Sequence, residues 1–166
     1  YPKSQLDSAW KKFLVVSEHN WGGADGRLAN AVKTEQAISA LDLAKGAREL
    51  ATKAIAKSIQ HHIEGIPIVV FNALSWQRRD IVQLKVQLAP FKYKALSLRD
   101  SEGADVPLQI IHRCLDNEGF LVDAEIVFDA EAPSVGYSSY YLQEGTIENG
   151  SPFKAEELAF ENPFFA

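Results

Sequence analysis

The chain has 166 residues, of which 46% are hydrophobic, so it is long enough to bury a core as one ordinary domain or two small ones. Its net charge of -5 and a pI near 5.4 leave no concentrated positive field, which excludes nucleic acid and anionic membrane surfaces as expected partners. No stretch approaches the roughly 20 apolar residues that span a bilayer, and the first residues lack the apolar run of a secretory signal. With a single cysteine, Cys114, a cytoplasmic location is the default expectation.

The first part of the chain has the pattern of two helices. Ser4 and Asp7 have the spacing of a capping box, and the apolar residues after them share one helical face, so we expect a helix over residues 5–17. Three glycines within residues 21–26 favour a loop, because glycine is costly inside a helix. A second helix is expected over residues 34–62, and its alanine-rich face suits close packing against another helix. The apolar positions of that face are Ala40, Leu43, Ala47, Leu50, Ala51 and Ala54.

Gly65 and Pro67 mark the change from helical to strand-like sequence, since glycine favours a helix C-terminus and proline cannot continue a helix. The following residues are either continuously apolar or alternate between apolar and polar, which is typical of strands. Strands are expected at residues 66–71, 82–88, 95–99, 106–114, 120–128 and 137–142, with turns at 101–103, 116–119 and 132–134. We therefore predict an α+β fold, with a helical, bundle-like region over residues 1–65 and part of an antiparallel β-sandwich over residues 66–166.

The histidines are the first candidate functional residues. Considered from the residues alone, His19 is a single histidine at the expected end of the first helix, where its charged form interacts favourably with the helix dipole. A metal site needs several ligands, and no cluster surrounds this histidine in the sequence. His61 and His62 with Glu64 form a second candidate metal group, although adjacent histidines on a helix point to different faces, which favours a solvated helix end.

Aromatic residues and the cysteine admit structural as well as functional interpretations. Trp10 lies on the apolar stripe of the first expected helix, so we predict that it belongs to the core. The tyrosines at 137, 140 and 141 are candidates for a platform that stacks on sugar rings, but aromatic side chains are enriched in strands, and a structural role is the stronger expectation. Cys114 lies between the apolar residues of an expected strand and is predicted to be a buried thiol.

Three segments together carry a likeness to a known family. Residues 9–22 end in Glu-His-Asn-Trp-Gly, residues 68–82 contain Phe-Asn-Ala-Leu-Ser-Trp, and residues 132–140 have the pattern Pro-x-x-Gly-Tyr-x-x-Tyr. In order and spacing, these segments resemble α-mannosidases of glycoside hydrolase family 38. The first is similar to the family's helix with a histidine-containing motif, and the second to the strand and turn with which these enzymes leave their helical bundle and start the β domain.

The resemblance implies a retaining glycosidase that removes terminal α-linked mannose with a zinc ion bound at the sugar. His19 matches the zinc-binding histidine of the family's helical region, and the other ligands would lie outside this chain. Asn20 matches a position where many members carry a sugar-contacting aspartate, and its amide can hydrogen-bond hydroxyl groups without that charge. No residue matches the catalytic carboxylates, so none is assigned as catalytic. The chain alone is expected to be inactive, because the catalytic α/β domain is absent.

The expected partners in the intact enzyme are a mannoside or oligosaccharide substrate and the missing catalytic domain. The chain contains no methionine, so Tyr1 is not expected to be a translation start and the sequence is expected to be a fragment. A truncated sandwich leaves an unpaired edge and an open apolar face, and for this reason we expect association, with a homo-oligomer as one form of it. The alternative function is a stand-alone carbohydrate-binding or interaction module.

Overall fold

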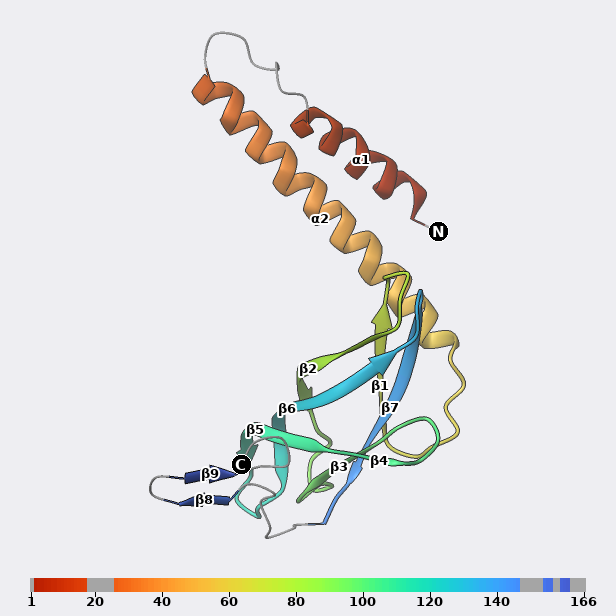
Figure 1. Ribbon diagram of the computed structural model, residues 1–166, viewed down its shortest axis with the longest axis vertical. Helices are drawn as coiled ribbons and strands as arrows, with labels where there is room; N and C mark the ends of the chain where they lie inside the picture. The colour runs from red at the N-terminus through yellow and green to blue at the C-terminus, as the bar shows by residue number, and fades with distance from the viewer. Residues whose placement is uncertain (1, 18–25, 147–153, 157–158, 162–166) are drawn as a thin grey trace. The chain divides into compact units, whose positions relative to one another are not determined.

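The computed structural model describes residues 2–17, 26–146, 154–156 and 159–161 (Figure 1). Its internal contacts divide the chain into two units, Tyr1–Gln60, which is helical, and His61–Ala166, which consists of strands. The predicted α+β class, with helices followed by an antiparallel sandwich-like part, is confirmed. No helix within the described ranges is both long enough and apolar enough to cross a membrane.

The helical unit consists of α1 over Lys3–Ser17 and α2 over Gly26–Ser58 (Figure 1). α1 agrees with its expected position, whereas α2 both begins and ends earlier than expected. Residues 27–32 contain neither glycine nor proline, so nothing in them prevents the helix from starting at its first glycine. At the other end, the Ser58 hydroxyl donates to the carbonyl oxygen of Ile55 at 2.7 Å and competes with continued helical pairing.

The two helices pack on each other through small side chains. The buried residues of the pair are Ala9 on α1 and Ala29, Ala40 and Ala47 on α2. Lys12 on α1 also donates from Nζ to Oε1 of Gln36 on α2 at 3.2 Å. The expected packing role of the alanine-rich face is confirmed at Ala40 and Ala47, where alanine lets two helix backbones approach closely, whereas Leu50 and Ala54 of the same expected face are exposed.

The prediction that Trp10 belongs to the core is wrong. Trp10 is 62% exposed and stacks on Phe13, with ring centroids 5.7 Å apart. Ala9 is the only buried residue of α1 among those described, so the rest of its apolar stripe lies at the surface of this unit. Helical periodicity identifies the apolar face correctly, but it does not tell how much of that face a second helix covers.

The second unit contains two antiparallel sheets, with strand orders β1-β7-β3-β4 and β2-β6-β5 (Figure 1). Their strands are β1 (Ile66–Asn72), β2 (Arg78–Gln87), β3 (Leu96–Arg99), β4 (Asp105–Val106), β5 (Leu108–Leu115), β6 (Leu121–Ala132) and β7 (Gly136–Glu144). All six expected strand regions are present. β2 starts before its apolar alternation begins, because the polar residues Arg78 and Arg79 still pair with the end of β6. A further hairpin of β8 (Lys154–Glu156) and β9 (Ala159–Glu161) was not expected.

The core of this unit draws on both sheets. Its largest fully buried side chains are Leu98 on β3, Leu121 and Ile126 on β6, and Leu142 on β7. Along β6, every second residue from Ala124 to Ala130 is buried, as expected for a strand that presents one face to a core. Burying a side chain of this size stabilises a fold by about 1.5–3 kcal/mol, so the stability of the unit resides mainly in this layer.

Two of the expected turns share one construction and are confirmed. In each, the Oδ1 atom of an aspartate accepts two backbone N–H groups at 2.9 Å, and a glycine with positive φ follows, Gly103 at 84° and Gly119 at 82°. The donors are Glu102 and Ala104 for Asp100, and Glu118 and Phe120 for Asp116. Aspartate favours such turns because its short side chain reaches the backbone two residues further on.

The prediction of a buried Cys114 thiol is also wrong, since Cys114 is exposed. It lies on β5, which is at the edge of its sheet. The register between β5 and β6 shifts after Ile110, and the alternation of burial along β5 ends there. The apolar neighbours of Cys114 in the sequence therefore do not imply that it faces the core, because a bulge changes which side of the strand each residue presents.

Candidate functional site

The two predicted site residues, His19 and Asn20, lie outside the described residues. The structure describes the segments on both sides of them, α1 up to Ser17 and α2 from Gly26. The metal-binding role of His19 and the sugar-binding role of Asn20 therefore stay predictions.

His61 belongs to the second candidate metal group, and its ring contacts a tyrosine. His61 lies edge-on to Tyr141, with ring centroids 5.7 Å apart, and its Nδ1 is 3.2 Å from the Tyr141 hydroxyl oxygen. His62 is exposed. Within the described ranges, no group of three or more histidine, cysteine, aspartate or glutamate residues is placed to hold a metal ion. The structure therefore gives no support to the alternative of a metal site at His61 and His62.

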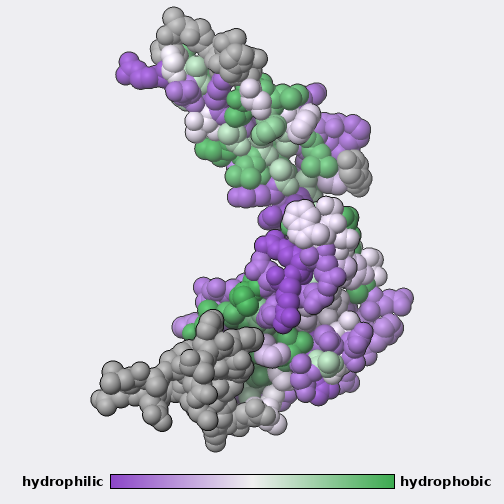
Figure 2. Space-filling model, in the orientation of Figure 1, coloured by the Kyte–Doolittle hydropathy of each residue, from purple (hydrophilic) through white to green (hydrophobic). Residues whose placement is uncertain are grey.

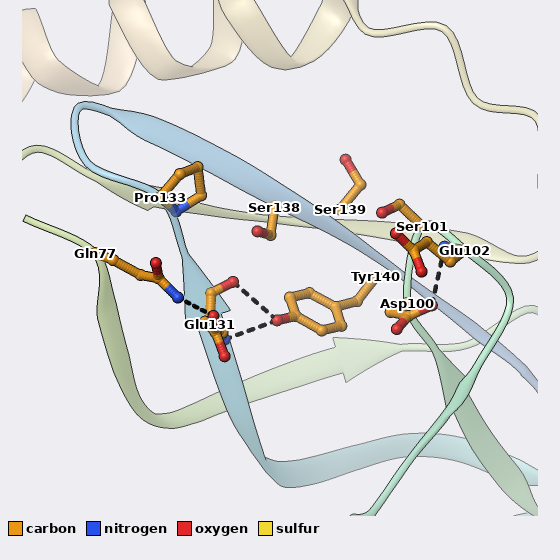
Figure 3. Close-up of a pocket in the computed structure, with 9 residues that line it drawn as sticks. All are labelled: Gln77, Asp100, Ser101, Glu102, Glu131, Pro133, Ser138, Ser139 and Tyr140. Carbon is orange, nitrogen blue, oxygen red and sulfur yellow. Dashed lines mark hydrogen bonds between the residues drawn. The ribbon is translucent and has the colours of Figure 1, made fainter.

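The β unit contains an open polar hollow of about 470 Å³ (Figure 3). It is formed by residues before β2, after β3, at the end of β6 and along β7. The lining residues are Gln77, Asp100, Ser101, Glu102, Glu131, Pro133, Ser138, Ser139 and Tyr140. Carboxylates, hydroxyls and one amide predominate, and the lining includes no lysine or arginine. The hollow therefore offers hydrogen-bonding groups of the kind that bind polyhydroxyl or cationic ligands.

Tyr140 holds one wall of this hollow in place. Its hydroxyl accepts the Glu131 N–H at 2.8 Å and donates to the Glu131 carbonyl oxygen at 3.1 Å, as the dashed lines in Figure 3 show. Its ring packs on Phe128, with centroids 5.1 Å apart. Burial raises the pKa of Tyr140 above its ordinary value of 10.0, although the backbone bond to Glu131 acts in the opposite direction. The hydroxyl is therefore protonated and hydrogen-bonded to the backbone of β6, so it is not free to act as a nucleophile.

Two of the three carboxylates that line the hollow have structural partners as well. Asp100 caps its own turn through Oδ1, and the Glu131 carboxylate accepts a hydrogen bond from the Gln77 amide. Retaining glycoside hydrolysis needs two carboxyl groups about 5 Å apart on either side of the scissile bond, one as nucleophile and one as acid. Carboxylates that are already engaged in holding turns and strand ends are poorly suited to that work. The contacts of Asp100 and Glu131 therefore favour a structural role for these two carboxylates.

Two of the three segments that resemble family 38, residues 68–82 and 132–140, are in contact at the buried side chain of Asn72. Asn72 at the end of β1 is only 6% exposed, and its Nδ2 donates to the carbonyl oxygens of Trp76 at 2.7 Å and Pro133 at 3.0 Å. Its Oδ1 accepts the Leu74 N–H at 3.0 Å, and the carbonyl oxygen of Leu74 accepts the Val135 N–H at 2.8 Å. Asn72 thus ties the β1–β2 connection to the β6–β7 turn.

This interlock explains what the two motifs do in the fold. A third carbonyl, that of Ala132, lies 3.3 Å from Asn72 Nδ2, so the amide faces three backbone oxygens. In the Pro-x-x-Gly-Tyr-x-x-Tyr motif, a Cβ on Gly136 would approach Pro133 Cγ to 2.9 Å, so only glycine fits without displacement. The sequence identified both segments by resemblance but did not reveal that they are in contact. A buried asparagine directly after an apolar strand was the available signal, since such a side chain must find hydrogen-bond partners.

The tyrosine platform is not assembled as a single surface. Tyr140 and Tyr141 are buried, whereas Tyr137 is 42% exposed and packs against Phe71 on β1, with ring centroids 5.8 Å apart. Adjacent strand residues point to opposite faces of a sheet, so three neighbouring tyrosines cannot all present their rings on one side. The structural interpretation of these residues is therefore the one that the contacts support.

The chain has a pair of helices followed by two antiparallel sheets. Its fold class is therefore a helical unit followed by a β-sandwich-like unit. Within that class, the fold is similar to a solved structure described as a protein in the glycosyl hydrolase family 38 from Enterococcus faecalis, with a TM-score of 0.58 and 18% sequence identity. The match covers 94% of this chain and 22% of that chain, so the chain spans about a fifth of that protein's length. No protein-family model and no curated protein matches the chain. The fold thus agrees with the family 38 resemblance of the three motifs over nearly the whole chain.

Proposed function

We propose that this chain is a segment of a retaining, zinc-dependent α-mannosidase of glycoside hydrolase family 38, which hydrolyses terminal α-linked mannose. One observation carries the proposal: the fold likeness extends over 94% of this chain but only 22% of a protein described as a family 38 glycosyl hydrolase. Such a ratio is expected when a chain corresponds to one region of a larger enzyme. The three motifs, in the same order as in the family, add support that is independent of the fold.

In this proposal the helical unit contributes His19 and Asn20 to the active site. Residues 18–25 join two helices that pack on each other, so the backbone on both sides of this segment is fixed by α1 and α2. His19 would bind zinc together with side chains outside this chain, because the described residues contain no group of ligands. Zinc, when bound, would orient the sugar hydroxyls and favour distortion of the ring. The Asn20 amide would hydrogen-bond a hydroxyl group.

The β unit has a supporting role and supplies no catalytic acid in this proposal. Asp100 and Glu131, two carboxylates of the polar hollow, already hold a turn and a neighbouring amide. The nucleophile and the general acid therefore belong to the missing catalytic domain, and the chain alone is inactive. An assay of the purified chain with an aryl α-mannoside and added zinc tests this directly. We expect no turnover, and measurable hydrolysis would refute the assignment of the catalytic groups to another domain.

The role of His19 is tested in the longer polypeptide that the proposal requires. His19→Ala should remove bound zinc and α-mannosidase activity together, because one of the metal's few protein ligands is lost. His62→Ala is the matched control, since this exposed histidine has no assigned role, and it should retain both properties. If the His19→Ala enzyme keeps its zinc content and its activity, the proposed ligand is wrong.

The alternative, a carbohydrate-binding module, is favoured by one specific feature, the polar hollow of the β unit. It predicts that the chain by itself binds methyl α-mannoside, with amide chemical-shift changes at Ser138 and Glu131 in a titration followed by NMR. The enzyme-segment proposal predicts no saturable change there. The two functions are thereby distinguished on the same purified chain.

A further inference from the structure

Residues 59–65 connect α2 to β1. A connection between two elements is by default a mobile part of a protein surface. Residues 61–65 are polar or glycine apart from Ile63, so apolar burial does little to hold them. In this they are like the visible face of the β unit, where hydrophilic side chains predominate, and unlike that of the helical unit, where hydrophobic side chains gather (Figure 2). Order in this segment must therefore come from polar and backbone contacts.

Two polar contacts hold this segment on β7. His61 Nδ1 lies 3.2 Å from the Tyr141 hydroxyl oxygen, and the two rings meet edge-on. The Glu64 carbonyl oxygen accepts a hydrogen bond from Gln143 Nε2 at 2.6 Å. Tyr141 and Gln143 are two residues apart on a strand, so their side chains lie on the same face of the sheet. The contacts therefore fasten the segment near both of its ends to one face of β7.

Gly65 brings the backbone of the segment against the backbone of β7. Its φ is 126°, and a Cβ at this position would lie 2.6 Å from the carbonyl oxygen of Leu142. Leu142 is paired with Ile66, so its carbonyl cannot move away without disturbing the pairing of β1 with β7. Only glycine fits here. Its role is this close approach and not the helix end that the sequence suggested, because α2 already ends at Ser58.

The two residues before this segment are held differently. The Ile59 N–H donates to the Ala56 carbonyl oxygen at 3.3 Å, which tightens the last turn of α2. Gln60 is exposed and makes no hydrogen bond with the residues that the structure describes. The internal contacts of the chain also divide it between Gln60 and His61. Attachment to the β unit thus begins at His61.

We propose that residues 61–65 form a strap fastened to β7, which confines the joint between the helical unit and the β unit to Ile59 and Gln60. A free segment over residues 59–65 could span roughly 25 Å, whereas two free residues span only about 7 Å. The strap thereby limits how far the end of α2 can move from the point where the β unit begins. This inference goes beyond the proposed enzymatic function and does not rest on it.

Backbone relaxation measured by NMR on the full chain tests the strap. The amide order parameters of residues 61–65 should be about 0.85, the value of rigid backbone, and should match those of β7. Lower values should be confined to Ile59 and Gln60. Order parameters below about 0.6 across residues 61–65 would overturn the proposal.

A glycine substitution releases the strap through its backbone. Gly65→Ala places a methyl group against the Leu142 carbonyl oxygen, so the order parameters of residues 61–64 should fall below about 0.6. Gly103→Ala is the matched control, because Gly103 also has a positive φ, 84°, but no atom lies within 4 Å of a Cβ added there. It should leave the strap as ordered as in the parent. An equally ordered strap in Gly65→Ala would contradict the close approach.

A second variant keeps the glycine, so that the test does not depend on the folding of Gly65→Ala. Tyr141→Phe combined with Gln143→Leu retains the ring and the side-chain size but removes both polar partners of the strap. Cleavage after Glu64 by a glutamate-specific protease, followed by mass spectrometry, should become about tenfold faster or more. The reason is that the strap must leave β7 before a protease can bind it, and two hydrogen bonds oppose this in the parent.

Tyr137→Phe combined with Gln109→Leu is the control for this double variant. It makes the same chemical changes at side chains that form no hydrogen bond with residues 61–65, so cleavage after Glu64 should keep the parent's rate. Circular dichroism confirms that each variant is folded. If Tyr141→Phe with Gln143→Leu is also cleaved at the parent's rate, these contacts do not fasten the segment and the proposal is wrong.

Discussion

The helical unit and the β unit differ in what they bury. Among the described residues, the helical unit buries only alanines, while Leu41 and Leu50 on α2 are each more than half exposed. The β unit buries large side chains completely, among them Leu98, Ile126 and Leu142. Both units have amphipathic elements. The difference is that the two sheets of the β unit share one core, whereas each described helix of the helical unit packs only on the other described helix of that unit.

A sequence can form regular secondary structure without forming a core of large buried side chains. Helical hydrogen bonds are satisfied within each helix, so α1 and α2 can form although much of their apolar surface stays exposed. Strands cannot satisfy their hydrogen bonds alone, and their pairing brings β1 and β7 together across more than 60 residues of chain. We therefore expect the β unit to resist unfolding longer than the helical unit when the chain is denatured.

The largest expected effect removes the polar interlock of the β unit. Asn72→Asp keeps the size of the side chain but replaces the donating amide by a carboxylate that faces three backbone carbonyl oxygens. An uncompensated buried charge costs about 3–5 kcal/mol, so urea unfolding should shift strongly to lower concentration. Hydrogen exchange in β6 should accelerate while that in α2 stays unchanged.

Asn117→Asp provides the control, because Asn117 is exposed in a turn. Its unfolding curve should coincide with that of the parent. If Asn72→Asp unfolds at the parent's urea concentration, the hydrogen bonds of Asn72 do not stabilise the β unit. The difference between the two units would then not include a contribution from these polar contacts.

Two leucine-to-alanine substitutions, one in each unit, measure how much apolar burial contributes to the difference in stability between the two units. Leu142→Ala deletes a side chain that is 0% exposed and should cost about 3 kcal/mol, since transfer and cavity terms add. Leu50→Ala makes the same chemical change at a position that is 55% exposed and should cost less than about 0.5 kcal/mol. Thermal unfolding followed by hydrogen exchange in each unit compares the two. Equal costs would mean that the helical unit is covered in solution by something that packs on Leu50.

Much of this fold follows from local patterns in the sequence. The strands were predictable because apolar alternation reports burial on one face, and the Asp100 and Asp116 turns because aspartate followed by glycine favours that geometry. Trp10 and Cys114 were predicted wrongly for a common reason. Each lies in an apolar stretch, but its burial depends on a neighbour that the local pattern does not specify, a covering helix in one case and a bulged edge strand in the other.

The candidate sites were less predictable than the fold. The hollow is assembled from residues of β6 and β7 and of the connecting segments before β2, after β3 and between β6 and β7, and no spacing rule brings these together. The contact between Asn72 and the Pro133 turn likewise depends on long-range strand pairing. His19 and Asn20 were identified by family resemblance and remain predictions of that resemblance.

The smallest expected effect concerns the Tyr140 clamp. Tyr140→Phe keeps the ring on Phe128 but leaves the Glu131 N–H and carbonyl oxygen without their partner, which should cost about 1–2 kcal/mol. Burial raises the pKa of Tyr140 in the folded state above 10.0, so the folded protein holds this proton more tightly than the unfolded chain. The resulting stability is complete below pH 10 and is lost as the pH rises through the folded pKa.

Urea unfolding of both proteins between neutral and strongly alkaline pH therefore separates the two contributions of the hydroxyl. The parent should lose stability above pH 10 more steeply than Tyr140→Phe, because other tyrosines and lysines titrate equally in both proteins and cancel in the difference. Parallel curves would show that the hydroxyl titrates alike in the folded and unfolded chains. In that case the pH dependence would not distinguish tyrosine from phenylalanine at this position, and the polar contribution to the stability of the β unit would be tested by Asn72→Asp alone.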